Sequence, residues 1–183
     1  MAYKGKYDPK SLANPAKYVG DVNNIIYRSL WERNVIRWLD ATPEIIEWAS
    51  EELIFKYTHP VTGKQARYYP DFFVRLSNGT TKVIEVKPKH QTQKPKTPKR
   101  KTAKYLEEVV TWAVNNEKWK AAFKLADRNN FTFEIWTEDT LKEMGILHWE
   151  TPKQTVLKES TKKKQKPVLK DIMVKRPRPK RKS

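Results

Sequence analysis

The spacing of apolar residues changes along the chain, and this change constrains the fold more than any other feature of the sequence. Residues 25–41, IIYRSLWERNVIRWLDA, place apolar side chains at helical intervals, which predicts an amphipathic helix. Residues 51–57 and 67–74 are instead rich in β-branched and aromatic residues, and HPVTGK between them is typical of a turn. These two stretches are therefore predicted to form a hairpin.

Further elements follow from the same two periods and from turn and cap residues. Thr42-Pro43 resembles the start of a second, short helix, and Ser77-Asn78-Gly79 is a turn that leads into a third strand. A short helix is predicted over residues 43–49, before the hairpin. After the hairpin come a strand over 82–86, helices over 102–115 and 119–128, a strand over 131–136 and a short helix over 139–144. This order predicts an α/β fold with a mixed sheet flanked by helices.

The formal net charge of +17 is spread unevenly along the chain. Residues 151–183 hold 13 Lys or Arg against two acids, which predicts a disordered basic tail after one domain over residues 1–150. Residues 87–104, called here the basic run, contain eight Lys or Arg, three prolines and no acid. Both segments would attract a polyanion such as the DNA backbone, and a solvated, solubilising surface is the alternative that composition leaves open.

Composition also excludes several classes of protein. The chain has no cysteine, so disulfides and thiolate metal sites such as zinc fingers are excluded. The polar start MAYKGKYDPK is unlike a secretory signal, and no apolar run is long enough to cross a bilayer. We therefore expect a soluble protein with no membrane partner.

Two acids lie among the strand-forming residues, and their positions indicate phosphate chemistry. Asp71 is near one end of a predicted strand and Glu85 near one end of the next, so pairing of the strands would bring two carboxylates together. Mg²⁺ is normally held by one or two carboxylates with water and phosphate oxygens. Lys87 is two residues after Glu85 and therefore on the same face of the sheet. Such a set suits hydrolysis of a phosphodiester.

Each of these residues taken alone also has a purely structural interpretation. Asp71 could pair with Arg67 or Arg75, and Glu85 and Lys87 could be surface residues of an edge strand. Only the joint pattern favours a metal site.

Pro70-Asp71, followed after 13 residues by Glu85-Val86-Lys87, resembles the motif of the PD-(D/E)XK nucleases, which share a restriction-endonuclease-like core of a mixed sheet flanked by helices. The resemblance extends over roughly residues 1–147 to the head completion nuclease family of tailed bacteriophages. It is carried by the stretches KYVGD, YRSLWER, PEIIEWASE, RYYPDFF, IEVKPK, NNEKWKAA and EIWTEDTLKEMG.

The resemblance implies a Mg²⁺-dependent DNA endonuclease, with Mn²⁺ as a substitute, that acts on double-stranded DNA at the filled head before tail joining. It implies Glu32, Asp71, Glu85 and Lys87 as catalytic residues, with the metal on the three acids and the Val86 carbonyl. It also implies phage head, portal or neck proteins as partners, and a location in the host cytoplasm or at the head vertex of the virion.

Polar residues that follow the motif are predicted to contact DNA phosphates. They are Lys89, Gln91, Lys94, Lys96, Lys99, Arg100 and Lys101. Two other functions stay open at this point. One is a structural connector or DNA-end-binding virion protein that keeps a nuclease fold without cutting. The other is the endonuclease subunit of a heteromeric Tn7-like transposase, in which a related motif pattern occurs.

Overall fold

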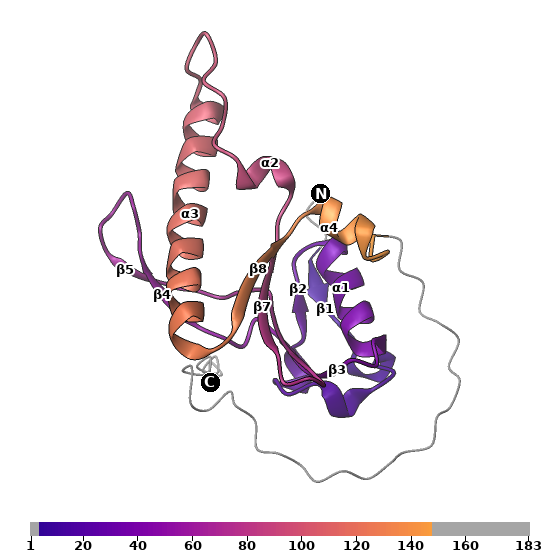
Figure 1. Cartoon of the computed structure of the whole chain (residues 1–183). Coiled ribbons are helices and arrows are strands. Elements are labelled where there is room, and N and C mark those ends of the chain that lie inside the picture. Colours follow the sequence, from indigo (N-terminus) through magenta and orange to yellow (C-terminus); the bar gives the residue numbers. More distant parts are fainter. Residues whose placement is uncertain (1–3, 148–183) are drawn as a thin grey trace, which may run out of the picture.

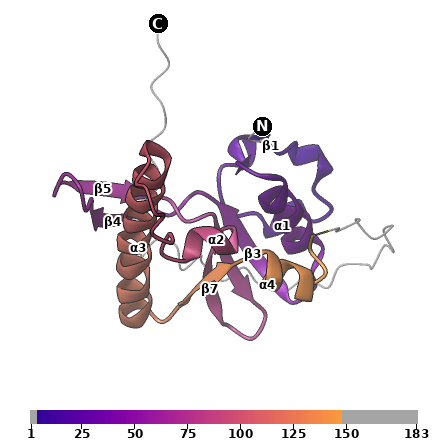
Figure 2. The same cartoon turned by 90° about the horizontal axis from the view of Figure 1, so that it is seen from above.

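The computed structural model describes residues 4–147, and the predicted basic tail over 151–183 lies outside them. At its centre is a four-stranded sheet in the order β3-β6-β7-β8. The strands span Ile45–Ser50, Phe72–Leu76, Thr81–Val86 and Thr132–Trp136. β7 and β8 are parallel and the other neighbours antiparallel, so the sheet is mixed, as predicted. Helix α1 (Leu30–Ala41) and helix α3 (Ala103–Asn129) lie on opposite faces of it (Figures 1 and 2).

Helix α1 confirms the helix predicted from the first apolar pattern. It begins after Ser29, whose side chain accepts a hydrogen bond from the Glu32 N–H and caps the helix. Its apolar stripe, Val35, Ile36 and Leu39, is fully buried against the sheet. Burying side chains of this size stabilises the fold by about 1.5–3 kcal/mol each. The preceding residues Ile26–Tyr27 form the short strand β2, which pairs with β1 (Gly5–Lys6).

The predicted hairpin is also present, and it packs beside α3 rather than in the central sheet. Strands β4 (Phe55–Thr58) and β5 (Gln65–Tyr68) pair antiparallel, and Gly63 in their turn has a φ of +66°, which favours glycine. The predicted last helix is α4 (Glu138–Glu143). The other short elements within residues 4–147 are helix α2 (Lys89–Thr92) and three 3₁₀ turns, at Pro9–Ser11, Pro15–Lys17 and Val22–Asn24.

The helix predicted over residues 43–49 is wrong, because this segment is strand β3. Its apolar residues, at positions 45, 46, 48 and 49, follow a helical spacing, so the local pattern favoured the wrong element. Antiparallel pairing with β6 satisfies the backbone groups of Ile45–Ser50 and buries Trp48 and Ala49. Pro43 therefore precedes a strand, and tertiary pairing decides the secondary structure.

The single strand predicted over 67–74 is two strands, β5 and β6. Between them lie Tyr69, Pro70 and Asp71, and proline has no N–H to give to a sheet. The strand predicted over 51–57 begins only at Phe55. Glu51 has a φ of +50°, a left-handed backbone conformation that ends β3 and interrupts the extended chain.

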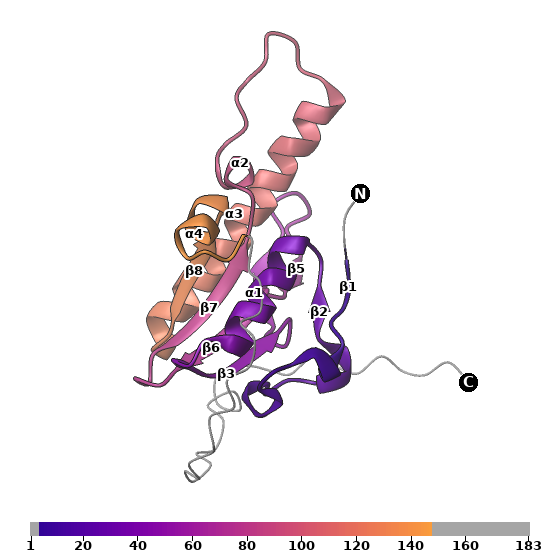
Figure 3. The ribbon, with the colours of Figure 1, turned by 90° about the vertical axis from the view of Figure 1, so that its right-hand side faces the viewer.

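The two helices predicted over 102–115 and 119–128 are one continuous helix, α3. No glycine or proline interrupts the segment between them, and the helix ends only at Asn130, which has a φ of +52°. Its buried residues begin at Asn115, so the N-terminal half projects beyond the sheet together with the connector, residues 93–102 (Figure 3). Neither α3 nor any other helix within residues 4–147 is long and apolar enough to cross a membrane.

Candidate active site

Asp71 and Glu85 lie opposite each other at one end of strands β6 and β7. The register pairs Phe72 with Ile84, which places the preceding Asp71 opposite the following Glu85. Both side chains are buried. Asp71 is held by a hydrogen bond of 2.7 Å from the Val86 N–H to its Oδ2 atom. Strand pairing thus places the two acids opposite each other, as the sequence predicted.

Lys87 lies on the same face as Glu85, as the two-residue period requires. Its Nζ atom is 3.0 Å from Glu85 Oε1, and the hydroxyl of Tyr68 donates to Glu85 Oε2 at 2.7 Å. The Lys87 N–H donates to the carbonyl of Trp136 on β8, which fixes the backbone at this point. Both oxygens of Glu85 therefore have fixed partners.

Burial and neighbouring charges perturb the protonation of this cluster. Burial raises the pKa of Asp71 well above its usual range, and the charge of Glu85 raises it further. Burial alone would lower the pKa of Lys87, but the charges of Asp71 and Glu85 outweigh it and raise that pKa. Lys87 is therefore held as an ammonium, and the surroundings of Asp71 favour added positive charge.

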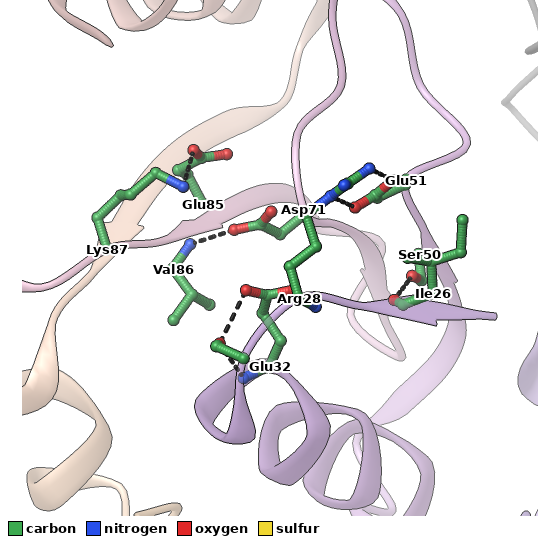
Figure 4. Close-up of polar contacts among 10 residues, drawn as sticks. Ile26, Arg28, Glu32, Ser50, Glu51, Asp71, Glu85, Val86 and Lys87 are labelled. Atoms are coloured by element: carbon green, nitrogen blue, oxygen red, sulfur yellow. Dashed lines mark hydrogen bonds and ion pairs between the residues drawn. The ribbon is translucent and has the colours of Figure 1, made fainter. Parts of the chain in front are cut away.

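Glu32 reaches this cluster from the first turn of α1 (Figure 4). It is buried, and burial raises its pKa. Its Oε1 accepts a hydrogen bond of 2.8 Å from the Ser29 hydroxyl, and its Oε2 accepts one of 2.6 Å from the Arg28 N–H. This is a variant of the capping box, in which the N–H of Arg28 takes the place of the N-cap N–H, so Glu32 has a structural role at the start of α1 whatever its part in catalysis.

No three His, Asp or Glu side chains within residues 4–147 are arranged to hold a metal ion together. The metal ligands predicted at Glu32, Asp71, Glu85 and the Val86 carbonyl therefore stay a prediction. Of the predicted ligands, Asp71 and Glu85 are the pair that lies on adjacent strand ends. It offers two carboxylates, and Mg²⁺ commonly uses one or two with water and phosphate oxygens as its other ligands.

Two charged residues beside Asp71, Arg28 and Glu51, lie in the stretches YRSLWER and PEIIEWASE but were not predicted as site residues. Glu51 is buried, its N–H donates to the Asp71 carbonyl at 3.0 Å, and its carboxylate forms a two-bond ion pair with Arg28 (2.5 and 2.8 Å). Asp71 lies between this ion pair and the Glu85–Lys87 pair (Figure 4). A left-handed glutamate at this point depends on tertiary structure alone, so the sequence could not indicate it.

The predicted DNA-binding residues follow β7 directly. Lys89 and Gln91 lie on the short helix α2, where the Lys89 ammonium is 2.7 Å from Asp139 Oδ2. The other five lie on the connector and are exposed: Lys94, Lys96, Lys99, Arg100 and Lys101. The structure therefore presents a row of cations after the site, and their contact with DNA stays a prediction.

A mixed sheet between two helices, with Asp71 and Glu85-Val86-Lys87 at the ends of adjacent strands, defines the PD-(D/E)XK class of restriction-endonuclease-like nucleases. Comparison with known proteins agrees. The family described as TnsA-like endonuclease N terminal matches residues 42–138, more than half of the chain. A head completion nuclease of Enterobacteria phage T4 is 43% identical over 150 residues, which cover 80% of this chain and 98% of that protein. The chain belongs to the head completion nuclease family, as its sequence resemblance predicted, and it is an endonuclease.

Proposed function

We propose that this chain is a Mg²⁺-dependent DNA endonuclease, with Mn²⁺ as a substitute, that processes DNA at the filled phage head before the tail joins. The observation that carries the proposal is the buried pair of carboxylates, Asp71 and Glu85, with the ammonium of Lys87 on one of them. Nucleases of this class are typically metal-dependent, and the relative from phage T4 is named for head completion. Host cytoplasm, and later the head vertex of the virion, is the location that fits this role.

The charge balance at the strand ends supports a divalent cation between Asp71 and Glu85. The two carboxylates are buried together, and Lys87 brings one positive charge to them. Repulsion by Glu85, added to burial, raises the pKa of Asp71, and a cation between the two would relieve both effects. When bound, the metal supplies an acidified water and neutralises charge on the scissile phosphate.

The residues of the chain hold this arrangement ready for substrate. The Val86 N–H fixes one oxygen of Asp71, and the Tyr68 hydroxyl fixes one oxygen of Glu85. The Lys87 side chain is 26% exposed, so a phosphate oxygen can reach its ammonium, which Glu85 already orients. A donor positioned in advance stabilises the developing charge without reorganising during the reaction.

The exposed cations of the connector would bind the duplex through its phosphates. Contacts to phosphates position DNA and carry no direct sequence information. We therefore expect cleavage with little sequence preference. Phage head, portal or neck proteins would then bring the enzyme to the correct DNA.

Nicking of supercoiled plasmid by the full chain tests the proposal. Wild type is expected to nick in Mg²⁺ or Mn²⁺ and to stop in EDTA. Asp71→Ala and Lys87→Ala should be inactive, whereas Asp127→Asn, at an exposed acid on α3, should cut like wild type. If folded wild-type protein nicks in neither metal, the result would instead favour the alternative function, a structural virion protein that joins parts of the particle or binds DNA ends without cutting.

The match to the TnsA-like family favours a second candidate, cleavage at transposon ends within a larger complex. The two candidates differ in what activity requires. Head completion predicts nicking by the isolated chain, whereas transposon-end cleavage predicts activity that appears only when a partner transposase is added.

A further inference from the structure

Lys118 lies in the middle of α3, at the point where the helix packs against the β4–β5 hairpin. Its Nζ atom is 5.6 Å from the ring centroid of Tyr68 and 5.9 Å from that of Tyr57. Both distances are within the range of a cation–π interaction, and both tyrosines are buried. The two rings therefore hold the ammonium in a fixed place.

Tyr68 connects this ammonium to the proposed metal site. One side chain contacts both groups, because the ring of Tyr68 faces Lys118 while its hydroxyl donates to Glu85 Oε2 at 2.7 Å. Burial lowers the pKa of Lys118, and the charges of Glu85, Lys87 and Asp71 also act on that pKa. Lys118 thus lies in the electrostatic field of the two carboxylates, although it comes from a different element.

The hydrogen-bonding capacity of Lys118 distinguishes it from Lys87. A lysine ammonium has three N–H donors, and a cation–π contact uses the charge without requiring a hydrogen-bond acceptor. The Lys87 ammonium donates to Glu85. Within residues 4–147, by contrast, the contacts of the Lys118 ammonium are with the two rings. Its donors are therefore available to a substrate.

We propose that Lys118 is a second substrate-binding lysine of the cleavage reaction, whose ammonium donates to a non-bridging phosphate oxygen of DNA bound at Asp71 and Glu85. The inference rests on the proposed endonuclease function and extends it to α3. A half-buried ammonium interacts with a phosphate more strongly than a fully hydrated one, and the two rings position it before substrate arrives. Lys87 and Lys118 would then bind the substrate from two different elements.

Lys118→Met is the variant that tests this role, because it keeps an aliphatic side chain over the two rings and removes the ammonium. Lys118→Arg keeps a cation, and Lys120→Met removes an exposed lysine from the same helix as a matched control. The full chain is used, and thermal unfolding checks that each variant is folded. The first measurement is the single-turnover cleavage rate of a plasmid with Mg²⁺ at saturating DNA.

Lys118→Met is expected to lower this rate about 10²-fold, since one preorganised donor to developing charge is removed. Lys118→Arg should recover part of the rate, and Lys120→Met should match wild type. Wild-type cleavage by Lys118→Met would overturn the inference while leaving the proposed function intact. The inference is also overturned if Lys118→Met is poorly folded and Lys118→Arg, though folded, recovers no cleavage.

A second measurement does not depend on cutting. Affinity for a short duplex is measured in EDTA over a range of salt concentrations, and loss of one phosphate contact should make the slope of log affinity against log salt shallower by about 0.9. This change is expected for Lys118→Met and not for Lys120→Met or Lys118→Arg. Equal slopes for all four proteins would contradict a phosphate contact at Lys118. A wild type that never nicks would instead contradict the proposed function.

Discussion

The strand ends and the connector differ in how far their charged side chains are exposed to solvent. At the strand ends, Asp71 and Glu85 are buried, and with Lys87 they are fixed by hydrogen bonds or ion pairs. On the connector, the lysines and the arginine are exposed. A buried charge acts strongly on a few neighbours, whereas exposed charges are screened by salt over about 10 Å. We therefore expect the strand ends to determine the rate of cleavage and the connector to determine DNA affinity.

Asp71→Asn is expected to have the largest effect, because it should lower the cleavage rate without changing duplex affinity. It removes one negative charge from the proposed metal site and should lower the cleavage rate about 10³-fold, which corresponds to about 4 kcal/mol of transition-state stabilisation. Duplex affinity measured in EDTA should stay near the wild-type value, because the connector is unchanged. Single-turnover cleavage and fluorescence anisotropy give the two quantities, with Asp127→Asn as the control. A cleavage rate of Asp71→Asn within a few fold of the wild-type rate would contradict the claim that the strand ends determine that rate.

Two lysine variants sharpen the comparison further. Lys87→Met should lower the cleavage rate at saturating DNA about 10²-fold, because it removes a donor that Glu85 orients toward the substrate. Lys101→Met, on the connector, should leave that rate unchanged. A loss of rate in both variants at saturating DNA would show that the connector also takes part in the chemical step.

Replacing three adjacent connector cations tests the other half of the comparison. The triple variant Lys99→Gln, Arg100→Gln, Lys101→Gln should make the slope of log affinity against log salt shallower by about 2.7, since each phosphate contact contributes about 0.9. Affinity near 0.1 M salt should fall about tenfold or more, while the cleavage rate at saturating DNA is retained. An unchanged slope would remove the connector from DNA binding.

The smallest expected effect is on stability, and its sign follows from the raised pKa of Asp71. Folding favours the neutral form of this group, so its contribution to stability is complete below the unfolded pKa of about 3.9 and is lost as pH rises through the folded pKa. At pH 7 without metal, Asp71→Asn should therefore melt a few degrees above wild type. The difference should vanish below about pH 3.9.

Added Mg²⁺ provides the companion measurement by scanning fluorimetry. A ligand that binds only the folded state raises the melting temperature, so Mg²⁺ should stabilise wild type more than Asp71→Asn. In the metal-free measurement at pH 7, an Asp71→Asn variant that melts below wild type would show that the Asp71 carboxylate stabilises the fold through its neighbours rather than destabilising it through burial.

Elements whose signals are local could be predicted from sequence. Helix α1 has its own cap at Ser29 and a single apolar stripe, and strand β8 has a clear alternation. Residues 43–49 were assigned wrongly as a helix, because their apolar spacing is helical and only pairing with β6 makes them a strand. The break between β5 and β6 was signalled by Pro70, yet the change of sheet at that point depends on tertiary packing.

The proposed site divides in the same way. Asp71, Glu85 and Lys87 lie on neighbouring strands, so strand periodicity and pairing were enough to bring them together. Glu51, at the end of β3, and Lys118 of α3, the proposed second lysine, are far from the motif in sequence and have no local spacing relative to it. Their positions depend on how the helix and the hairpin pack on the sheet.

The central claim is that Asp71 and Glu85 hold one divalent cation beside Lys87. Crystals of the full chain soaked in Mn²⁺ test it directly through anomalous scattering. We expect one strong peak within coordination distance of oxygens from both carboxylates, and its loss in Asp71→Asn crystals. Mn²⁺ bound elsewhere, with Glu85 still on Lys87 and Asp71 still on the Val86 N–H, would contradict the claim.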